Sequence, residues 1–453
     1  MAERTIQTTC CVAGGGPAGI MLGYLLARAG IAVTVLEKHG DFFRDFRGDT
    51  VHPSTLEVLR ELGLLDAALS LPHQKVYTAG GVYGDFSFTG PDFRHVPAHS
   101  KFVALMPQWD FLNFLSAKAK RFQFFDLRMH HEAYDLLWDG DRVAGVLART
   151  AVGATVEIRT ELVVGCDGRH STIRQAARLE MREYGVPIDV LWFRISRRPG
   201  DPSDVLGSIN YGKALILINR NDYFQAGMIV RKGSFDEIRR RGIEAFRTDI
   251  RQLAPYLSDR VADLQDWDQV QLLTVQLNRL RQWHRPGLLC IGDAAHAMSP
   301  AGGVGINLAV QDAVAAANVL THSTRYRFGD DAELEAIQRR RELPARVTQA
   351  VQVGLHKVFA RVFDHPGPLQ APWQLRAAVR IPGIHRALGY AVGMGVRPEH
   401  VRGVPRRRYG RGIVQALAFG AAVGAAVGAA VGVLIRGHAA RSGIVRQEAL
   451  RLR

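Results

Sequence analysis

Cysteine is scarce in this chain, since its 453 residues include only four cysteines, at positions 10, 11, 166 and 290. They form no Cys-x-x-Cys pair and have no histidine at zinc-ligand spacing, so no disulfide framework and no metal site is expected. All four lie in or beside apolar runs, which indicates small buried side chains in a reducing cytoplasm. A secretory signal is also missing, because Glu3 interrupts any basic N-terminal region.

The composition excludes disordered and collagen-like proteins, since apolar residues make up 47% and charged residues 22% of the chain. The net charge is +15, and many arginines lie late, in 397–411 and 436–453. These two basic clusters flank an uncharged stretch at 412–435, a pattern typical of attachment to anionic membrane surfaces. Nucleic acid is not expected as a partner, because no basic patch with interleaved aromatic residues accompanies the arginines.

The N-terminal residues predict a βαβ unit. Residues 5–13 indicate a buried strand, residues 17–29 a helix that Gly30 ends, and residues 31–36 a second strand. Two strands joined by a helix imply a parallel sheet.

Further along the chain, helices are expected at 54–62, 109–120, 235–253 and 304–320. Strands are expected within 71–105, 132–166, 186–232, 265–283 and 288–291. From 333 to about 400 the pattern is helical, with breaks at 365–368 and 381–383.

The turn after the first strand fits Gly-x-Gly-x-x-Gly, with Gly14, Gly16 and Gly19. In this motif the first glycine permits a tight turn, the second lets the backbone approach a pyrophosphate, and the third allows close packing of helix on strand. The pyrophosphate charge would be met by the helix N-terminus. Glu37, at the end of the second strand, can accept hydrogen bonds from a ribose diol. The sequence therefore predicts a dinucleotide site, and a glycine turn that merely packs tightly is the alternative.

Two later segments narrow the type of dinucleotide. Residues 163–168 form a strand that ends in Asp167-Gly168, and residues 288–293 form a strand that ends in Gly292-Asp293. A carboxylate at the carboxyl end of a strand lies where α/β sheets bind ligands. The glycine-rich loop at 300–307 then opens a helix, which offers backbone N–H groups to a phosphate or an electron-rich ring.

These motifs, in this order, resemble those of the FAD-dependent aromatic hydroxylases, the monooxygenases typified by p-hydroxybenzoate hydroxylase and the ubiquinone-biosynthesis hydroxylases. The segment 47–56 and Gln108 also look like stretches of that family. The resemblance covers about residues 5–400 and leaves out the C-terminal tail. It implies an α/β fold in which a Rossmann-like FAD-binding domain with a mostly parallel sheet is interleaved with an α+β antiparallel-sheet substrate domain, followed by C-terminal helices.

The resemblance also implies roles for single residues. Glu37 would bind the adenosine ribose, Arg47 and Gln108 the pyrophosphate and ribityl region, and Asp293 the ribityl chain. The loop 300–307 would run under the isoalloxazine ring, and Asp167-Gly168 would lie near the pyrophosphate and affect NAD(P)H use. The full set of expected cofactor-binding residues is Gly14, Gly16, Pro17, Ala18, Gly19, Glu37, Lys38, Arg47, Gln108, Asp167, Gly168, Gly292, Asp293, Pro300, Gly303, Gly305, Ile306 and Asn307.

The implied reaction uses tightly bound FAD, NADH or NADPH as a transient co-substrate, and O2. A flavin C4a-hydroperoxide would hydroxylate or epoxidise a lipophilic aromatic, quinone-like or isoprenoid substrate. The flavin performs the oxygen chemistry, so no catalytic triad is required. Arg194 and His296 are the catalytic candidates, with an ion pair and a loop-orienting role as their structural alternatives. His52 is a further catalytic candidate, and its structural alternative is hydrogen bonding to backbone groups at a helix start. Tyr211 and Tyr223 are candidates for lining the substrate pocket.

The expected domains are discontinuous. Residues 1–70, 100–180 and 285–343 would form the FAD-binding domain, 71–99 and 181–284 the substrate domain, and 344–405 a helical region. Residues 412–435 would form an Ala/Gly-rich membrane helix, followed by a basic tail at 436–453. As a helix, 412–435 would be about 36 Å long, enough to cross a bilayer core.

The tail leaves its own alternatives open. Residues 421–432 are three copies of Ala-Ala-Val-Gly, so 412–435 could span a membrane, lie on it or pack on the enzyme. The protein is expected in the cytoplasm, attached to the cytoplasmic face of a membrane, with a homodimer as one open assembly.

Two other functions are weighed against a monooxygenase. One is an FAD-dependent reductase of the geranylgeranyl-reductase type, which would not consume O2 in step with its substrate. The other is a non-catalytic, membrane-tethered flavoprotein, which would bind FAD without nicotinamide turnover. A flavin halogenase is disfavoured, since no Trp-x-Trp-x-Ile-Pro segment is present.

Overall fold

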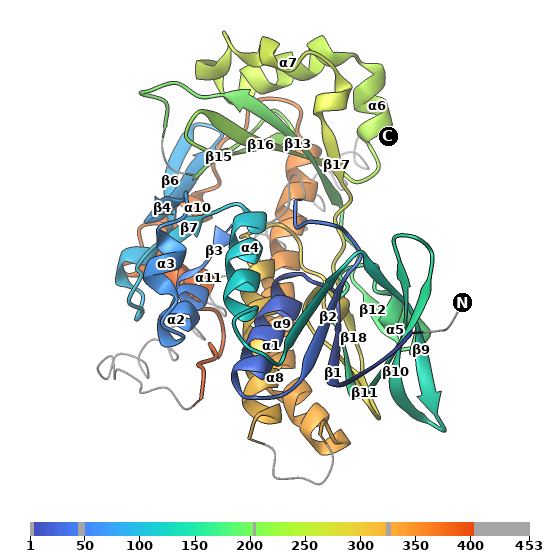
Figure 1. Cartoon of the computed structure of the whole chain (residues 1–453). Helices are drawn as coiled ribbons and strands as arrows, with labels where there is room; N and C mark the ends of the chain where they lie inside the picture. Colours follow the sequence, from blue (N-terminus) through green and yellow to red (C-terminus); the bar gives the residue numbers. More distant parts are fainter. Residues whose placement is uncertain (1–3, 44–49, 203–204, 323–327, 403–453) are drawn as a thin grey trace, which may run out of the picture.

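The computed structural model describes residues 4–43, 50–202, 205–322 and 328–402, and its core is built on two large sheets (Figure 1). One sheet is mostly parallel and the other mostly antiparallel, with helices packed around both. The α/β fold class expected from the sequence is confirmed.

The N-terminal part forms a βαβ unit from β1 (Arg4–Ala13), α1 (Pro17–Arg28) and β2 (Val33–Glu37). β1 and β2 are parallel neighbours, so the predicted strand–helix–strand unit is confirmed. α1 lies close to the sheet because glycines face it. A Cβ at Gly23 would lie 2.8 Å from the side chains of Val35 and Phe125.

The parallel sheet has the strand order β19-β20-β11-β1-β2-β8. Its members come from distant parts of the chain: β8 (Phe125–Met129), β11 (Thr155–Gly165), β19 (His284–Arg285) and β20 (Leu288–Cys290). β11 lies parallel to both β1 and β20. It therefore stands between the first strand of the chain and a strand that follows much later in the sequence. An antiparallel extension of β9 (His131–Asp139) and β10 (Arg142–Thr150) pairs with β11.

The second sheet has the order β17-β13-β16-β15-β14-β5-β6. Its strands are β5 (Thr78–Tyr83), β6 (Phe86–Asp92), β13 (Ile188–Ser196), β14 (Val205–Asn210), β15 (Lys213–Asn219), β16 (Tyr223–Arg231) and β17 (Gln271–Leu273). All of them fall within the two segments expected to form the substrate domain, 71–99 and 181–284.

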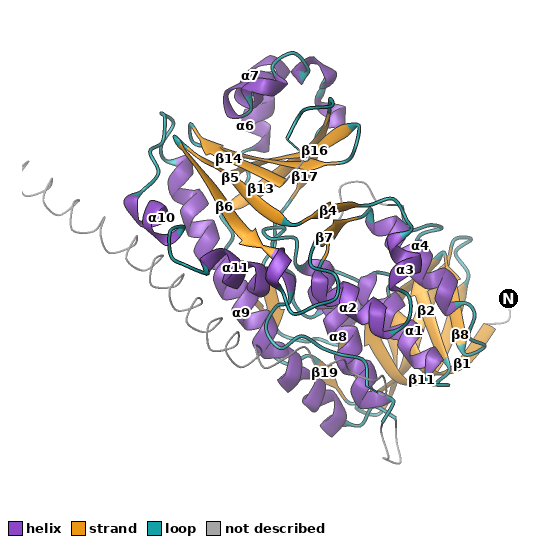
Figure 2. Cartoon of the chain, turned by 90° about the vertical axis from the view of Figure 1, so that its left-hand side faces the viewer, coloured by secondary structure: helices purple, strands orange, loops and turns teal. Residues whose placement is uncertain are grey.

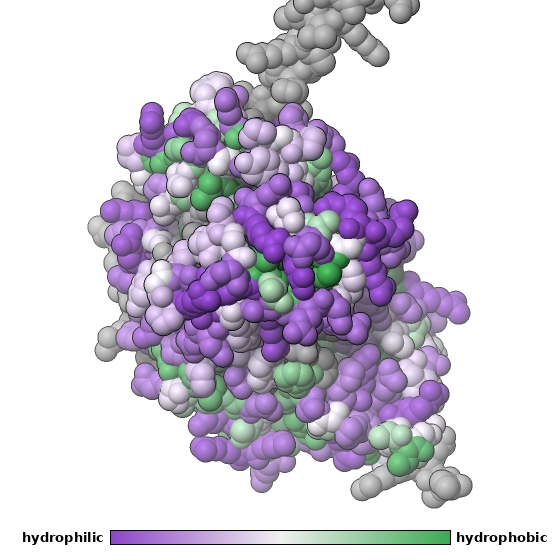
Figure 3. All heavy atoms as spheres, turned by 90° about the horizontal axis from the view of Figure 1, so that it is seen from above, coloured by the Kyte–Doolittle hydropathy of each residue, from purple (hydrophilic) through white to green (hydrophobic). Residues whose placement is uncertain are grey.

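The two faces of the second sheet have different neighbours. Leu191, Phe193 and Phe224 pack with Phe246 of α7 (Ile243–Leu253) in a separate core on the outer face. Trp192, on the opposite face of β13, belongs to the main core that the parallel sheet also contributes to. Figures 1 and 2 show α6 (Phe235–Arg240) and α7 over the outer face, and Figure 3 shows that this side is largely hydrophilic.

The single helix expected at 235–253 is wrong in one respect, because it is divided into α6 and α7. The division lies at Gly242, whose φ of +86° is outside the helical region. A glycine adopts this conformation at little cost, so it ends one helix and starts the next in a new direction.

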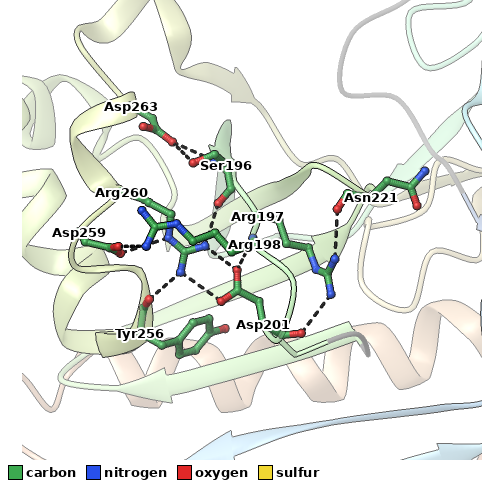
Figure 4. Close-up of polar contacts among 9 residues, drawn as sticks. All are labelled: Ser196, Arg197, Arg198, Asp201, Asn221, Tyr256, Asp259, Arg260 and Asp263. Atoms are coloured by element: carbon green, nitrogen blue, oxygen red, sulfur yellow. Dashed lines mark hydrogen bonds and ion pairs between the residues drawn. The ribbon is translucent and has the colours of Figure 1, made fainter.

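An ion-pair cluster joins the connection after β13 to the segment after α7 (Figure 4). Arg260 is buried, and its guanidinium contacts both carboxylate oxygens of Asp201, at 2.5 and 3.1 Å. This hydrogen bonding holds the pKa of Asp201 below its ordinary value. Arg197 donates to the backbone oxygens of Asp201 and Asn221. The cluster contains none of the expected cofactor-binding residues, and its contacts hold the sheet to its outer helices.

The C-terminal region is helical, as predicted, with α9 (Asp331–Phe363), α10 (Trp373–Ala378) and α11 (Ile384–Gly393). The boundary expected between 343 and 344 falls inside α9, which continues through Pro344. α9 contacts β19 of the first sheet and β13, β15 and β16 of the second, so one helix links the two sheets. α11 packs tightly on β6, because a Cβ at Gly389 would lie 1.9 Å from the Asp92 carbonyl oxygen.

Shorter elements complete the described part of the chain. They are β3 (Thr50–Val51), α2 (Pro53–Glu61), α3 (Leu65–Leu69), β4 (Gln74–Val76), β7 (Val103–Leu105), α4 (Gln108–Ala119), α5 (Thr172–Ala176), β12 (Met181–Glu183), β18 (Asn278–Leu280) and α8 (Gly305–Leu320). The helices predicted at 54–62, 109–120 and 304–320 are therefore confirmed.

Some expectations fall on residues that the structure does not describe. These are Arg47, the membrane helix at 412–435 and the basic tail at 436–453. Among the described residues, none of the helices combines the length and apolar character that crossing a membrane requires.

Candidate active site

Four parallel strands end at the same edge of the first sheet. Ala13 of β1 is in register with Leu36 of β2 and with Gly165 of β11, and Gly165 is in register with Cys290 of β20. The residues that follow these strand ends are therefore brought side by side. They are the expected cofactor-binding residues Gly14, Glu37, Asp167 and Asp293.

The glycine turn after β1 is shaped by its neighbours. Gly14 has a φ of +110°, and a Cβ there would lie 2.4 Å from the Cys166 carbonyl oxygen. A Cβ at Gly19 would lie 1.9 Å from the Gly14 carbonyl oxygen, so α1 starts close against the turn. At Gly16 an added Cβ would meet nothing within 4 Å. The turn is thus closed toward the protein and open on the side of Gly16.

The N-terminus of α1 carries no side-chain cap. Gly16 is its N-cap residue, Pro17 follows, and no acidic residue lies in the first turn. The first N–H groups of a helix have no partner within the helix, and together with the helix dipole they favour an anion. Ala18 packs against Gly292, where an added Cβ would lie 3.2 Å from the Ala18 Cβ. This contact sets the helix against the strand end after β20.

Glu37 is held by the backbone on both sides. Its Oε2 accepts a hydrogen bond from the Gly15 N–H at 3.1 Å, and its Oε1 accepts one from the His39 N–H at 3.0 Å. A carboxylate oxygen can accept more than one hydrogen bond. Lys38, by contrast, is exposed and lies 4.0 Å from Glu132 of β9.

Asp167 lies shortly before α5 and is half-buried. Its Oδ2 accepts a hydrogen bond from the Ile173 N–H at 3.0 Å, while its Oδ1 is buried without a partner among the described residues. Burial raises the pKa of Asp167 above its ordinary value. Gly168 has a φ of +86° and open space on its Cβ side.

Asp293 is the more open carboxylate of the site. Its Oδ2 accepts a hydrogen bond from Arg169 Nε at 3.2 Å, and its side chain stays 33% exposed. A second arginine, Arg174, is buried and donates to the carbonyl oxygens of Ala294 and Arg169, at 2.9 and 2.8 Å. Arg174 thereby fixes the backbone on both sides of the Arg169–Asp293 pair.

The glycine-rich loop after Ser299 is held from the side of α2. Gly302 and Gly303 have φ values of +83° and +62°. The Gly303 carbonyl oxygen accepts a hydrogen bond from Thr50 Oγ1 at 2.6 Å and lies 3.0 Å from His52 Nε2. His52 is buried and also lies 2.9 Å from the Val392 carbonyl oxygen, so it satisfies backbone groups.

The loop then enters α8. Gly305, like Gly16, has nothing within 4 Å of an added Cβ. Asn307 is buried, and its Oδ1 accepts hydrogen bonds from Ser54 and Thr55 of α2, both at 2.7 Å. Pro300 and Ile306 flank these glycines, and Gln108 is the first residue of α4, which packs on α1.

The same loop is also held from α9, by residues that sequence reasoning missed. Gln352 accepts a hydrogen bond from the Ser299 N–H at 3.1 Å and donates to the carbonyl oxygens of Ser299 and Ala301, both at 2.9 Å. His356 Nε2 lies 2.8 Å from Ser299 Oγ. Burial lowers the pKa of His356 to about 4, which keeps the ring neutral at pH 7. A cluster of polar residues on one face of the long helix was the only sequence signal available.

His296 lies behind the site. Its Nε2 is 2.6 Å from Asp312 Oδ2, its ring packs against Trp283 at 5.0 Å between centroids, and it is buried. Asp312 also accepts hydrogen bonds from Arg341 Nε at 2.8 Å and from the Gly292 N–H at 3.1 Å. This geometry gives His296 a structural place beneath the strand end.

Arg194 belongs to the second sheet. It is exposed on β13, and its guanidinium lies over the ring of Tyr223 at 5.1 Å. Tyr211 lies in the turn between β14 and β15, with a φ of +50°. Trp192, two residues before Arg194, is nearly buried, and its indole N–H has no partner among the described residues.

Comparison with known proteins decides the family. A family model described as an FAD binding domain matches residues 7–351, more than half of the chain. The 6-methylpretetramide 4-monooxygenase of Streptomyces rimosus is 32% identical over 382 residues, which cover 83% of this chain and 89% of the relative. The chain belongs to the FAD-dependent aromatic monooxygenases.

Solved structures share the fold of this FAD-dependent monooxygenase. The anhydrotetracycline hydroxylase OxyS from Streptomyces rimosus has a TM-score of 0.67 at 22% identity, covering 86% of this chain and 76% of that chain. PqsL, a probable FAD-dependent monooxygenase from Pseudomonas aeruginosa, has a TM-score of 0.67 at 20% identity, covering 79% and 100%. The chain is therefore an FAD-dependent oxidoreductase with the fold of these enzymes.

Proposed function

We propose that this monooxygenase uses NAD(P)H and O2 to hydroxylate a lipophilic aromatic substrate, of the pretetramide type that the name of its Streptomyces rimosus relative indicates. One oxygen atom of O2 would enter an aromatic C–H bond and the other would leave as water. NAD(P)H would supply a hydride, and solvent the proton that completes the water. The convergence of Gly14, Glu37, Asp167 and Asp293 at one sheet edge carries this proposal.

The residues at this edge fit FAD. The open space beside Gly16 leaves room for a pyrophosphate. The N–H groups at the start of α1 have no side-chain cap, so they can bind its negative charge. The buried Oδ1 of Asp167 lacks a partner among the described residues, and a bound cofactor or an ordered water would give it one. When bound, FAD supplies the redox and oxygen chemistry, and the protein binds, orients and shields it.

Each side chain then has a binding task. Glu37 would accept hydrogen bonds from the ribose hydroxyls, and Asp293 would accept one from the ribityl chain. The open backbone at Gly305 would offer N–H groups to the ring system at the start of α8. Arg169 would hold the Asp293 side chain in place.

The substrate would lie against the inner face of the second sheet. Trp192 supports this proposal, because its indole N–H is buried on that face and lacks a partner among the described residues. A buried donor without a partner is costly, so a substrate oxygen that accepts this hydrogen bond would be recognised. Arg194 and Tyr223 would border the same region.

NAD(P)H would visit the site transiently, since the sequence has no second Gly-x-Gly-x-x-Gly after a strand. The need for NAD(P)H in turn supports a cytoplasmic location for the enzyme.

Anaerobic reduction of the flavin tests the proposal. The holoenzyme is mixed with NADH or NADPH, with and without a panel of pretetramide-type aromatics, phenols, quinols and isoprenoids, and the loss of flavin absorbance is timed. We expect large acceleration by one aromatic class, followed in air by incorporation of one atom of isotopically labelled O2. Fast reduction regardless of ligand would favour a reductase or oxidase and contradict the proposal.

A matched variant sharpens this test. Trp192→Phe keeps an aromatic six-membered ring and removes the indole N–H, so it should weaken ligand binding by about fivefold, the effect of one neutral hydrogen bond. Reduction without ligand should stay unchanged. Unchanged ligand affinity would remove Trp192 from the substrate site without touching the monooxygenase assignment.

A further inference from the structure

The outer face of α9 carries an apolar stripe. Leu343, Val347, Val351 and Leu355 are 39%, 36%, 50% and 39% exposed. Residues four apart lie along one side of a helix, so these four side chains form a continuous ridge. At 1.5 Å per residue the ridge is about 18 Å long. They belong to the large hydrophobic side chains that the described residues leave partly exposed.

The stripe is unusual because the opposite face of the same helix is polar and buried. Gln349, Gln352 and His356 are buried there. Gln352 and His356 bond to Ser299 of the glycine-rich loop, and Gln349 donates to the carbonyl oxygens of Asn278 and Ala297. A surface helix normally places its apolar residues toward the core and its polar residues toward water. Here the pattern is reversed over this stretch, which indicates that something covers the outer face.

The charges beside the stripe help to identify its occupant. Arg339, Arg340 and Arg346 border it, and each is paired with a carboxylate: Arg339 with Glu335 at 2.9 Å, Arg340 with Glu399 at 2.7 Å, and Arg346 with Glu342 at 4.0 Å. Paired arginines attract anionic lipid headgroups less than unpaired ones do. The border therefore favours an uncharged protein surface over a membrane.

We propose that residues 412–435 of this chain dock lengthwise, as a helix, on this stripe of α9. The segment is uncharged, and its glycines at positions 420, 424, 428 and 432 repeat every four residues, as the stripe does. Glycine at this spacing leaves a shallow groove along one side of a helix. Ridges of i±4 side chains packed into such grooves are the commonest way in which helices pack.

The segment can reach the stripe. Glu399 pairs with Arg340 beside Leu343, and the Arg402 N–H donates to Asn318 Oδ1 at 2.9 Å. Residues 403–411 follow, and at about 3.3 Å per residue they span up to roughly 30 Å. A helix of the length of 412–435, about 36 Å, would cover the whole stripe. A tether this short also raises the local concentration of the segment to about the millimolar range.

Cross-linking in the full-length holoenzyme tests the docking. In the variant Val351→Cys/Gly428→Cys, a short thiol cross-linker should join α9 to the tail within one chain, as read by peptide mass spectrometry. The native cysteines are buried and do not interfere. The control Glu237→Cys/Gly428→Cys places the first thiol on α6, over the second sheet, and should give at least tenfold less product. FAD content reports folding, and Val347→Cys/Gly424→Cys is the reserve pair.

The alternatives give different results. Cross-links between chains would mean that a second copy of the protein, and not the tail of the same chain, covers the stripe. The full-length protein could instead bind vesicles of neutral and anionic phospholipid and give no intrachain cross-link. This result would mean that a membrane, and not the tail, covers the stripe. Equal yields from the test and control pairs would mean that the tail contacts α6 as often as α9 and has no specific docking site. Each of these outcomes overturns the proposal, and none of them affects the assignment of the flavin site.

Discussion

Asp293 and Asp312 lie close to the same strand end but in opposite surroundings. Asp312 is fully buried between His296 and Arg341, whereas Asp293 is partly exposed and paired with Arg169. A buried carboxylate with its hydrogen bonds satisfied stabilises the fold, and an open one can bind a ligand. The two residues should therefore respond differently to the same substitution.

Asp293→Ala should release FAD. A hydrogen bond to a charged group contributes about 1.5–3 kcal/mol, so FAD affinity should fall by roughly 10- to 100-fold. The ratio of flavin to protein absorbance after gel filtration measures the loss. Asp293→Asn, which can still accept a hydrogen bond, serves as the control and should retain more FAD. Full FAD loading of the alanine variant would contradict the role of Asp293.

Asp312→Asn should destabilise the protein by about 3 kcal/mol, because it removes the nearer carboxylate of the buried Arg341 and leaves it only Glu399, 3.6 Å away. Burial alone would raise the pKa of Asp312, but His296 and Arg341 outweigh it and hold this pKa below its ordinary value. The stabilisation is therefore complete above about pH 4 and is lost as the pH falls through the lower pKa of the folded state.

Urea unfolding of wild type and Asp312→Asn at several pH values measures this effect. The difference in unfolding free energy should be constant near neutral pH and shrink in acid. A difference that grew in acid would mean that Asp312 is protonated in the folded state.

At the scale of single elements, α9 positions the glycine-rich loop through its inner face. Gln352→Ala would leave the Ser299 N–H and the carbonyl oxygens of Ser299 and Ala301 without a side-chain partner. Unsatisfied buried groups cost about 1–3 kcal/mol each, although loop movement and water recover part of this. We expect weaker FAD binding and a changed flavin fluorescence spectrum.

Val351→Ala is the matched control for this prediction. It lies one residue away on the outer face of α9 and is half exposed. It should leave the flavin spectrum as in the wild type. Equal spectral changes in both variants would mean that any disturbance of α9 reaches the flavin, and that Gln352 has no specific positioning role.

Local chemistry made much of this fold readable from the sequence. The glycines at 14, 16 and 19 and the acid at 37 define a βαβ unit within one short segment, so β1, α1 and β2 were predicted correctly. Pairings between distant segments were not readable. The roles of Thr50, Gln352 and Asp312 depend on where β3, α9 and α8 pack, and residue type and spacing alone do not specify that.

A glycine ends one helix of this chain, whereas a proline lies inside another. Gly242 divides α6 from α7, although the apolar pattern runs through both. The domain boundary expected between 343 and 344 falls inside α9, which continues through Pro344. A proline in a helix removes one hydrogen bond, yet Pro344 is accommodated as a buried residue within α9.

At the scale of the whole molecule, FAD should stabilise both sheets together. The residues that fit it extend from Gly14 to Asn307, and α9 links the two sheets. At a free FAD concentration of 100 times Kd, binding adds about 2.7 kcal/mol to the unfolding free energy. Thermal unfolding of holo- and apoprotein should each show one transition, shifted upward by FAD. Two transitions, with one insensitive to FAD, would show that the sheets unfold independently.

The strand order of the parallel sheet also has a consequence for synthesis. β11 pairs with β1 along one edge. Near its carboxyl end, the partner of its other edge is β20, at Leu288–Cys290, which is synthesised much later. On the ribosome, the nascent chain therefore carries an open strand edge while β13 to β17 of the second sheet are translated. The Gly292–Asn307 half of the cofactor site emerges later still. Flavin capture in this enzyme thus belongs to the last stage of chain maturation, and until then the open edge is the point at which chaperones would be needed.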